Sequence, residues 1–176
     1  MQWMKKLLVG VVVLIVVVAA VGVLLPATVH VERSIAIQAP PATVFPYVNN
    51  YRLFNTWSPW AKKDPATQYT YSGPESGVGA KLSWSSQNEN VGKGSQEIIE
   101  SEPDKRVKAA LDFDGMGKPT ASYTLLADGD GTRVTWAFDE DFGYNLLARY
   151  FGLLFEKFIG PDYEQGLANL KAVVES

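Results

Sequence analysis

The sequence predicts an α+β domain in which a curved antiparallel β-sheet wraps around a long, kinked C-terminal helix, preceded by one transmembrane helix. Three observations support this prediction. Leu7 to Leu25 is an apolar run without a charged side chain, and it follows Lys5 and Lys6. Short strand-like stretches separated by turn residues then fill the middle of the chain. From Tyr144 onward, apolar residues recur with helical spacing.

The apolar run 7–25 is long enough to cross a bilayer. Its 19 residues span roughly 28 Å as a helix, close to the thickness of the hydrocarbon core. A cleaved secretory signal is the alternative, but small residues such as Ala19 and Ala20 lie inside the apolar run rather than after it. We therefore favour an uncleaved anchor, preceded by a cytoplasmic N-terminus of residues 1–6.

Basic residues near the two ends of the run predict its orientation. Lys5 and Lys6 precede it, whereas Arg33 is the one basic residue within about ten positions beyond it. Cytoplasmic flanks of membrane helices carry the excess of Lys and Arg. We therefore expect a single-pass protein of the cell membrane, with its N-terminus in the cytoplasm and its domain on the extracytoplasmic side.

Residues 29–176 have the size and composition of one soluble domain. The chain has 16 basic and 19 acidic residues, and leaving out Lys5 and Lys6 gives 14 against 19, a formal charge of −5. Such acidity argues against a nucleic-acid partner, because nucleic-acid-binding domains usually present a basic face. The chain has no cysteine, which excludes disulfides, thiolate metal sites and cysteine nucleophiles.

The first part of the domain is expected to contain one strand and an aromatic corner. Residues 29–37 alternate, with β-branched side chains prominent, and predict a strand that ends before Pro40-Pro41. A short helix over 41–48 follows, because proline is tolerated in a first helical turn. Residues 49–60 form a compact aromatic corner that closes with Trp57-Ser58-Pro59-Trp60.

The middle of the chain predicts a run of further strands joined by short turns. They are residues 68–71, 80–85, 91–100, 106–113, 121–126 and 132–138. Asp128-Gly129-Asp130-Gly131 between the last two is a hairpin signal, because Asp-Gly accommodates positive φ angles. The close spacing of the strands indicates an antiparallel meander.

The C-terminal region predicts a long helix that covers the concave face of the sheet. Residues 144–159 carry one broad apolar face. Its members are Leu147, Tyr150, Phe151, Leu154, Phe155 and Phe158. We expect Gly160-Pro161 to interrupt this helix and a second segment to begin at Pro161, which accounts for the predicted kink.

This order of elements, together with several short motifs, resembles the SRPBCC or START-like superfamily of polyketide cyclases and dehydrases. The motifs are Ile35-x-Ile37-x-Ala39-Pro40, Trp57-Ser58-Pro59-Trp60, Gly77-Val78-Gly79, Gly92-x-Gly94 with Ile98-Ile99 and Pro103, and Gly166 to Lys171. The resemblance covers about Val29 to Glu175. It implies a helix-grip fold whose sheet and C-terminal helix enclose a hydrophobic cavity for lipids, sterols, polyketides or other apolar ligands. It implies no shared catalytic machinery.

The predicted ligand-binding residues are large side chains that alternation and helical spacing place on the concave side. They are Trp57, Trp60, Trp84, Leu111, Phe113, Tyr123, Trp136, Phe138, Tyr150, Phe151, Leu154 and Phe158. The same side chains would equally form a filled core, and the Trp57–Trp60 corner would then be purely structural. Residues 114–118 are a candidate second entrance or a plain turn.

Catalytic and metal-binding motifs are poorly represented. His30 is the single histidine and lies just after the apolar run, so a serine–histidine triad or a multi-histidine metal site has no basis. The acidic residues Asp112, Asp114, Asp139, Glu140 and Asp141 would supply a general acid or base if one were buried, but their pattern favours solvated positions. We expect no metal and no cofactor.

The sequence therefore favours a membrane-anchored domain that binds a hydrophobic or amphipathic small molecule, such as a lipid or a polyketide-like compound, without catalysis. Two alternatives stay open. An exported sensory or scaffolding domain would contact a partner protein and have a filled core. A cyclase- or dehydratase-like enzyme would place a titratable group with a perturbed pKa inside the cavity.

Overall fold

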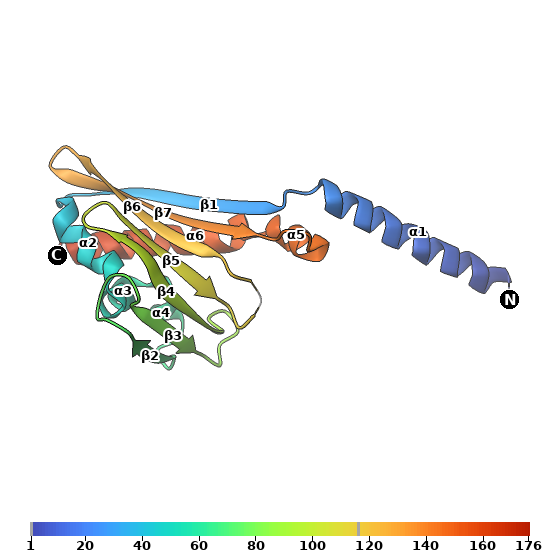
Figure 1. Ribbon diagram of the computed structural model, residues 1–176, viewed down its shortest axis with the longest axis horizontal. Coiled ribbons are helices and arrows are strands. Elements are labelled where there is room, and N and C mark those ends of the chain that lie inside the picture. Colours follow the sequence, from blue (N-terminus) through green and yellow to red (C-terminus); the bar gives the residue numbers. More distant parts are fainter. Residues whose placement is uncertain (1, 116) are drawn as a thin grey trace.

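The computed structural model describes residues 2–115 and 117–176 (Figure 1). The chain begins with helix α1 (Gln2–Leu24), which extends away from the rest of the molecule (Figure 1). The elements that follow it are β1 (Thr28–Ile37), α2 (Pro41–Asn49), α3 (Tyr51–Trp57), α4 (Pro59–Lys63), β2 (Gln68–Ser72), β3 (Lys81–Ser85), β4 (Lys93–Glu102), β5 (Arg106–Asp112), β6 (Thr120–Asp128), β7 (Gly131–Asp141), α5 (Leu146–Gly152) and α6 (Phe155–Val174).

Within the described residues, seven strands form one sheet in the order β1-β7-β6-β5-β4-β3-β2. Every neighbouring pair is antiparallel, so β2 to β7 form the predicted meander and β1 joins its β7 edge. The hairpin between β6 and β7 turns at Gly129, whose φ of 60° agrees with the Asp-Gly signal. The α+β class predicted from the sequence is confirmed.

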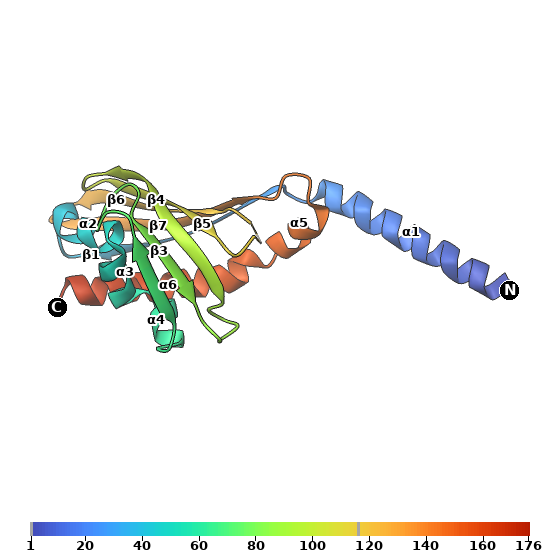
Figure 2. The ribbon, with the colours of Figure 1, turned by 60° about the horizontal axis from the view of Figure 1, so that its bottom comes forward.

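The inner face of the sheet is set by strand register. Val31 in β1 is opposite Phe138 in β7, and Tyr123 in β6 is opposite Trp136 in β7. Residues opposite one another share a face, so these rows form one apolar surface. Helix α6 runs along this part of the sheet beside β1 (Figure 2). The most deeply buried side chains between these layers include Val31, Val107, Val134, Trp136, Leu167 and Leu170.

The aromatic corner consists of α3 and α4 and is joined to α6 by hydrogen bonds. Asn50 caps α3, since its side-chain oxygen accepts a 2.8 Å hydrogen bond from the backbone N–H of Arg52. Trp57 is fully buried, and its indole N–H donates to the carbonyl of Tyr47 at 2.9 Å. Asn169 of α6 donates to the carbonyl of Trp57 at 3.0 Å. The corner is therefore fixed against the C-terminal helix.

The C-terminal helical region is divided at a different position from the predicted one. The sequence predicted an interruption at Gly160-Pro161, but α6 runs from Phe155 to Val174 with Pro161 inside it. The break lies at Leu153 and Leu154, between α5 and α6. The prediction of a helix end near residue 159 was therefore wrong.

Contacts on both sides of Pro161 explain why α6 continues through it. A proline inside a helix removes one backbone hydrogen bond and costs about 3 kcal/mol. Arg33 of β1 binds Glu156 at 2.5 Å and Glu164 at 2.6 Å, one on each side of the proline. Farther along, Gly166 packs directly against Trp136. These contacts hold α6 against the sheet on both sides of the proline.

Candidate functional site

A cavity of about 270 Å³ lies between the inner face of the sheet, the aromatic corner and α6. Its lining is mostly aromatic and aliphatic. It includes eight of the twelve predicted ligand-binding residues, namely Trp60, Trp84, Leu111, Phe113, Tyr123, Trp136, Phe138 and Phe158. The sequence left open a core completely filled by side chains, and this cavity shows that the core is not completely filled.

Trp136 is central to the cavity wall. Its ring stacks on that of Tyr163 in α6, with centroids 3.8 Å apart and an angle of 12° between the planes. Trp60 meets it edge-on at 5.8 Å. Gly166 lets α6 approach this closely, because a Cβ there would lie 2.7 Å from the Trp136 ring. The Trp136 indole N–H is buried and has no hydrogen-bond partner among the described residues.

Trp84 forms a wall on the β3 side of the cavity. Its indole N–H donates to the carbonyl of Val91 at 3.2 Å. The six-membered ring lies against Gly94 of β4, where a Cβ would come within 2.6 Å of it. Phe113 meets the ring edge-on at 5.9 Å. The second glycine of the Gly92-x-Gly94 motif thus leaves room for a flat indole at the cavity wall.

Four of the predicted residues do not line the cavity. Trp57 lies behind Trp136, with ring centroids 5.4 Å apart, and is completely buried. Tyr150, Phe151 and Leu154 lie beyond the cavity, in α5 and just before α6. Phe151 and Leu154 are exposed to solvent, and the hydroxyl of Tyr150 donates to a carbonyl of α1. Ligand contact by any of the twelve residues stays a prediction.

Several lining residues were not predicted from the sequence. Gln96 is buried in β4 and faces Leu111 of β5. Its alternation with Ile98 was a signal for an inward position, but a glutamine in a strand is usually assigned to the solvent side. Tyr163 precedes Leu167 by four residues on the inner face of α6, a helical spacing that also marked it.

The cavity lining carries little net charge, because its carboxylate is paired with a lysine and its tyrosines are neutral. Asp162, the one carboxylate in the lining formed by the described residues, pairs with Lys63 at 2.6 Å. Burial raises the pKa of Tyr123 and of Tyr163, because a phenolate would lose its hydration there. Both hydroxyls are protonated at neutral pH, as unperturbed tyrosines also are.

Glu140 differs from its expected solvated position. It follows Trp136 and Phe138 on the same face of β7 and is half-buried. Desolvation raises the pKa of this carboxyl, and its Oε2 atom has no partner among the described residues. Glu140 is nevertheless outside the cavity lining. Residues 114–118, the candidate second entrance or plain turn, include Met116, which lies outside the described residues.

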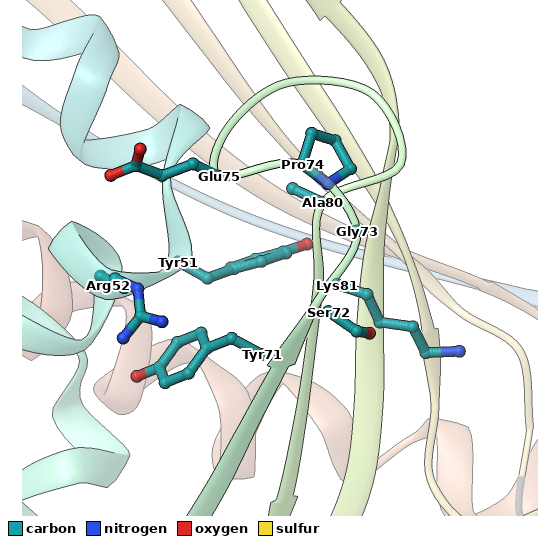
Figure 3. Close-up of a pocket in the computed structure, with 9 residues that line it drawn as sticks. All are labelled: Tyr51, Arg52, Tyr71, Ser72, Gly73, Pro74, Glu75, Ala80 and Lys81. Atoms are coloured by element: carbon teal, nitrogen blue, oxygen red, sulfur yellow. The ribbon is translucent and has the colours of Figure 1, made fainter.

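A separate hollow of about 340 Å³ lies between α3 and the loop that joins β2 to β3 (Figure 3). The guanidinium of Arg52 lies over the ring of Tyr71, 4.4 Å from its centroid. The ring of Tyr51 extends from α3 toward the loop, and its buried hydroxyl has no partner among the described residues (Figure 3). The polar character of this hollow distinguishes it from the aromatic cavity.

Known structures with the same fold have little sequence in common with this chain. A protein of Chromobacterium violaceum is 19% identical, with a TM-score of 0.55, and the match covers 86% of this chain and 99% of that protein. A norcoclaurine synthase from Thalictrum, solved with a transition-state analogue, is 12% identical with a TM-score of 0.63 and coverage of 84% and 94%. A Staphylococcus aureus protein of unknown function is 15% identical with a TM-score of 0.60 and coverage of 84% and 95%.

These likenesses establish the helix-grip fold and nothing about chemistry, because a fold does not fix a function. No curated protein matches the sequence. The model of one protein family, however, matches residues 28–175, which is almost the whole region after α1. With the cavity between sheet and helix, this match identifies the chain as a member of the family described as polyketide cyclase / dehydrase and lipid transport.

Proposed function

We propose that this protein is a membrane-anchored, non-catalytic domain that binds a hydrophobic or amphipathic small molecule, lipid-like or polyketide-like, in its internal cavity. The observation that carries the proposal is the cavity of about 270 Å³ with its aromatic lining. Its volume is close to the lower end of the range of ligand pockets, roughly 300–1,000 Å³. A compact ligand, or part of a longer one, suits this space.

The polar groups of the lining suit a ligand with an apolar body and a few hydrogen-bond acceptors. Tyr163 is one polar-tipped side chain of the lining, and a ligand carbonyl or hydroxyl would suit it. The amide of Gln96 adds a second polar group to the lining. A charged ligand is less suitable, since Asp162 already pairs with Lys63.

Helix α1 supports the membrane part of the proposal. Among the described residues it is the one helix long and apolar enough, by length and composition, to cross a membrane. Its apolar side chains are exposed along most of its length, as lipid contact requires. We place residues 7–25 in the bilayer, residues 1–6 in the cytoplasm and residues 29–176 on the other side, because Lys5 and Lys6 precede the apolar run.

The two alternative functions have weaker support. An enzyme of the cyclase or dehydratase type needs a general acid or base with a pKa near neutrality. The pKa shifts of Tyr123 and Tyr163 are upward, away from neutrality, and Glu140 lies outside the lining. A scaffolding domain with a filled core does not account for the cavity. A protein partner remains compatible with a bound ligand.

Uptake of a fluorescent fatty acid would test the proposal. The full chain is placed in lipid nanodiscs, and energy transfer from tryptophan to a dansyl fatty acid is measured. Ala121 lines the cavity, so Ala121→Leu fills part of it. Ala110 lies on the other face of the neighbouring strand β5, and Ala110→Leu makes the same change there as a matched control.

We expect saturable transfer in the wild type and in Ala110→Leu. We expect Ala121→Leu to weaken binding about tenfold or more, equivalent to 1.4 kcal/mol, with an unchanged circular dichroism spectrum. Equal uptake by Ala121→Leu and the wild type would contradict the proposed site. Native mass spectrometry of the wild type, with solvent extraction, then gives the mass of any ligand that co-purifies.

A further inference from the structure

Exposed apolar side chains are concentrated in one segment of the domain, at α5 and the beginning of α6. Single exposed apolar residues such as Val78 and Leu126 occur elsewhere in the domain. Six lie within residues 144–158, and we call them the α5 patch. They are Tyr144, Leu147, Phe151, Leu153, Leu154 and Phe158, with between 43% and 98% of each residue exposed. A soluble protein rarely leaves such a group facing water without a partner.

The side chains of the α5 patch cannot pack against the sheet, because the opposite side of the same segment already does. Leu147 and Phe151 are four residues apart and share one side of α5, and Leu154 and Phe158 have the same spacing at the beginning of α6. The other side is already packed: Phe155 contacts Phe138, with ring centroids 5.5 Å apart. The patch therefore faces outward because the opposite face of the same segment holds it to the sheet.

Helix α5 is also attached to the end of α1. The Arg149 guanidinium donates to the carbonyls of Val23 at 3.2 Å and of Leu25 at 3.3 Å, which are among the last in α1 and just beyond it. Gly22 is buried, and Leu146 packs against it. Figures 1 and 2 both show α5 beside the domain-proximal end of α1, at the end of the domain opposite the C-terminus.

These contacts fix the depth of α5 relative to the apolar run. The hydroxyl of Tyr150 donates to the carbonyl of Val18 at 2.6 Å. Val18 lies seven residues before Leu25, and seven helical residues span about 10 Å. Amphipathic helices in a membrane interface are buried by about 5–10 Å. With α1 across the bilayer, α5 therefore lies at the depth of an interfacial helix.

We propose that the α5 patch inserts into the leaflet beside the end of α1 and that the cavity exchanges its ligand with the bilayer there. The occupant of the patch is lipid, because the patch is continuous with the apolar helix to which α5 is bonded. Phe158 joins the two sites, since it is 64% exposed in the patch and also lines the cavity. The inference rests on the proposed function for the anchoring role of α1.

Fluorescent labelling of the full chain tests this inference directly, because the protein has no cysteine of its own. Leu147→Cys and Phe151→Cys place an NBD label in the α5 patch. Leu126→Cys is the matched control, since Leu126 is similarly exposed, at 58%, but lies near the β6–β7 hairpin. Leu14→Cys reports on α1. Each variant is reconstituted in phosphatidylcholine vesicles that contain nitroxide-labelled lipid.

We expect the labels at 147, 151 and 14 to be quenched by the nitroxide lipid, with shallow nitroxides more effective at 147 and 151. The label at 126 should be unaffected. Quenching at 14 without quenching at 147 or 151 would overturn the inference and leave the anchor intact. A blue-shifted but unquenched label at 147 would indicate a protein neighbour and would also overturn it. Absence of quenching at 14 would refute the anchor itself, and the patch inference with it.

A charge substitution tests whether the patch serves ligand exchange. Leu147 is in the patch and outside the cavity lining, and it is not among the predicted ligand-binding residues, so Leu147→Glu leaves the binding site unchanged. We expect it to slow transfer of the dansyl fatty acid from the bilayer several-fold, with unchanged affinity at equilibrium. Leu126→Glu, the control, should change neither. An unchanged transfer rate in Leu147→Glu would exclude the exchange route through the patch.

Discussion

His30, the single histidine of the chain, contacts carboxylates of two strands. It is half-exposed, at the start of β1, and its Nδ1 atom lies 2.7 Å from Asp139 of β7. Its Nε2 atom lies 3.3 Å from Glu32. The hydrogen bond to Asp139 is the main cause of a pKa raised above the ordinary 6.5, with a smaller contribution from Glu32. The residue connects the strands β1 and β7.

The first prediction concerns the pH dependence of this contact. The pKa of His30 is higher in the folded chain than in the unfolded one, so its contribution to stability is fully present below pH 6.5. The contribution is lost as the pH rises through the raised pKa of the folded state. All three groups are exposed, which limits the effect to under about 1 kcal/mol.

Nuclear magnetic resonance gives this pKa without assignment, because the chain has one histidine. We expect a pKa above 6.5 in the wild type and a value closer to 6.5 in Asp139→Asn. A wild-type pKa at or below 6.5 would contradict the geometry of the contact.

At the scale of the element, α6 is shaped by the sheet more than by its own sequence. Gly166 is the clearest case. Replacing a glycine by alanine inside a helix normally stabilises it by about 1 kcal/mol. Here the new Cβ would lie 2.7 Å from the ring of Trp136 and 3.1 Å from Pro59. Neither a buried indole nor a proline ring can move aside easily, so packing opposes helix propensity.

We therefore predict that Gly166→Ala destabilises the domain by about 1–3 kcal/mol, the usual cost of overpacking. Ala168→Gly, at an exposed position of the same helix, is the control, because it changes helix propensity without changing the contact with the sheet. Chemical unfolding of both variants in detergent, followed by circular dichroism, measures the difference. A Gly166→Ala variant as stable as the wild type, or more stable, would show that α6 does not approach Trp136 so closely.

Most helices and strands could be predicted from local sequence patterns. Where the structure differs from the prediction, the difference has a physical cause. Alternation and turn residues give the strands, because both are properties of neighbouring residues. The sequence predicted a break at Gly160-Pro161, but Pro161 lies inside α6. Arg33 of β1, more than a hundred positions away, contacts α6 on both sides of this proline, and no local pattern shows that contact. For the same reason, helical spacing grouped Tyr150 with the cavity although it contacts α1.

The cavity lining was predictable where a large apolar residue alternates in a strand, as at Trp84 and Trp136. It was missed at Gln96, because a glutamine in a strand is usually assigned to the solvent side even where it alternates with a buried residue such as Ile98. Nor could the sequence distinguish a side chain that lines the cavity from one that packs behind the lining. Trp57 and Trp60 are three positions apart, yet Trp57 is sealed behind Trp136 and Trp60 lines the cavity.

At the scale of the whole molecule, the proposed insertion of α1 into a membrane would determine which compartment the cavity faces. Lys5 and Lys6 lie at the far end of α1 from the domain. The excess of basic residues at that end predicts an extracytoplasmic domain. A reporter enzyme that is active only outside the cytoplasm should therefore show activity when it is fused after Ser176. A cytoplasmic reporter at the same position should be silent, and the reverse pattern would contradict the orientation.

The same arrangement, through the short connection between α1 and β1, limits how far the domain can travel. Residues 25–27 are all that separate the two elements, and three extended residues reach at most about 11 Å. The connection is further restrained because the N–H of Phe142 donates to the carbonyl of Ala27 at 2.8 Å. With the proposed anchor in a membrane, the domain would be unable to cross an aqueous compartment with the proposed ligand. It would act as a stationary receptor that samples only its own membrane, and delivery to a second membrane would require another protein to collect the ligand.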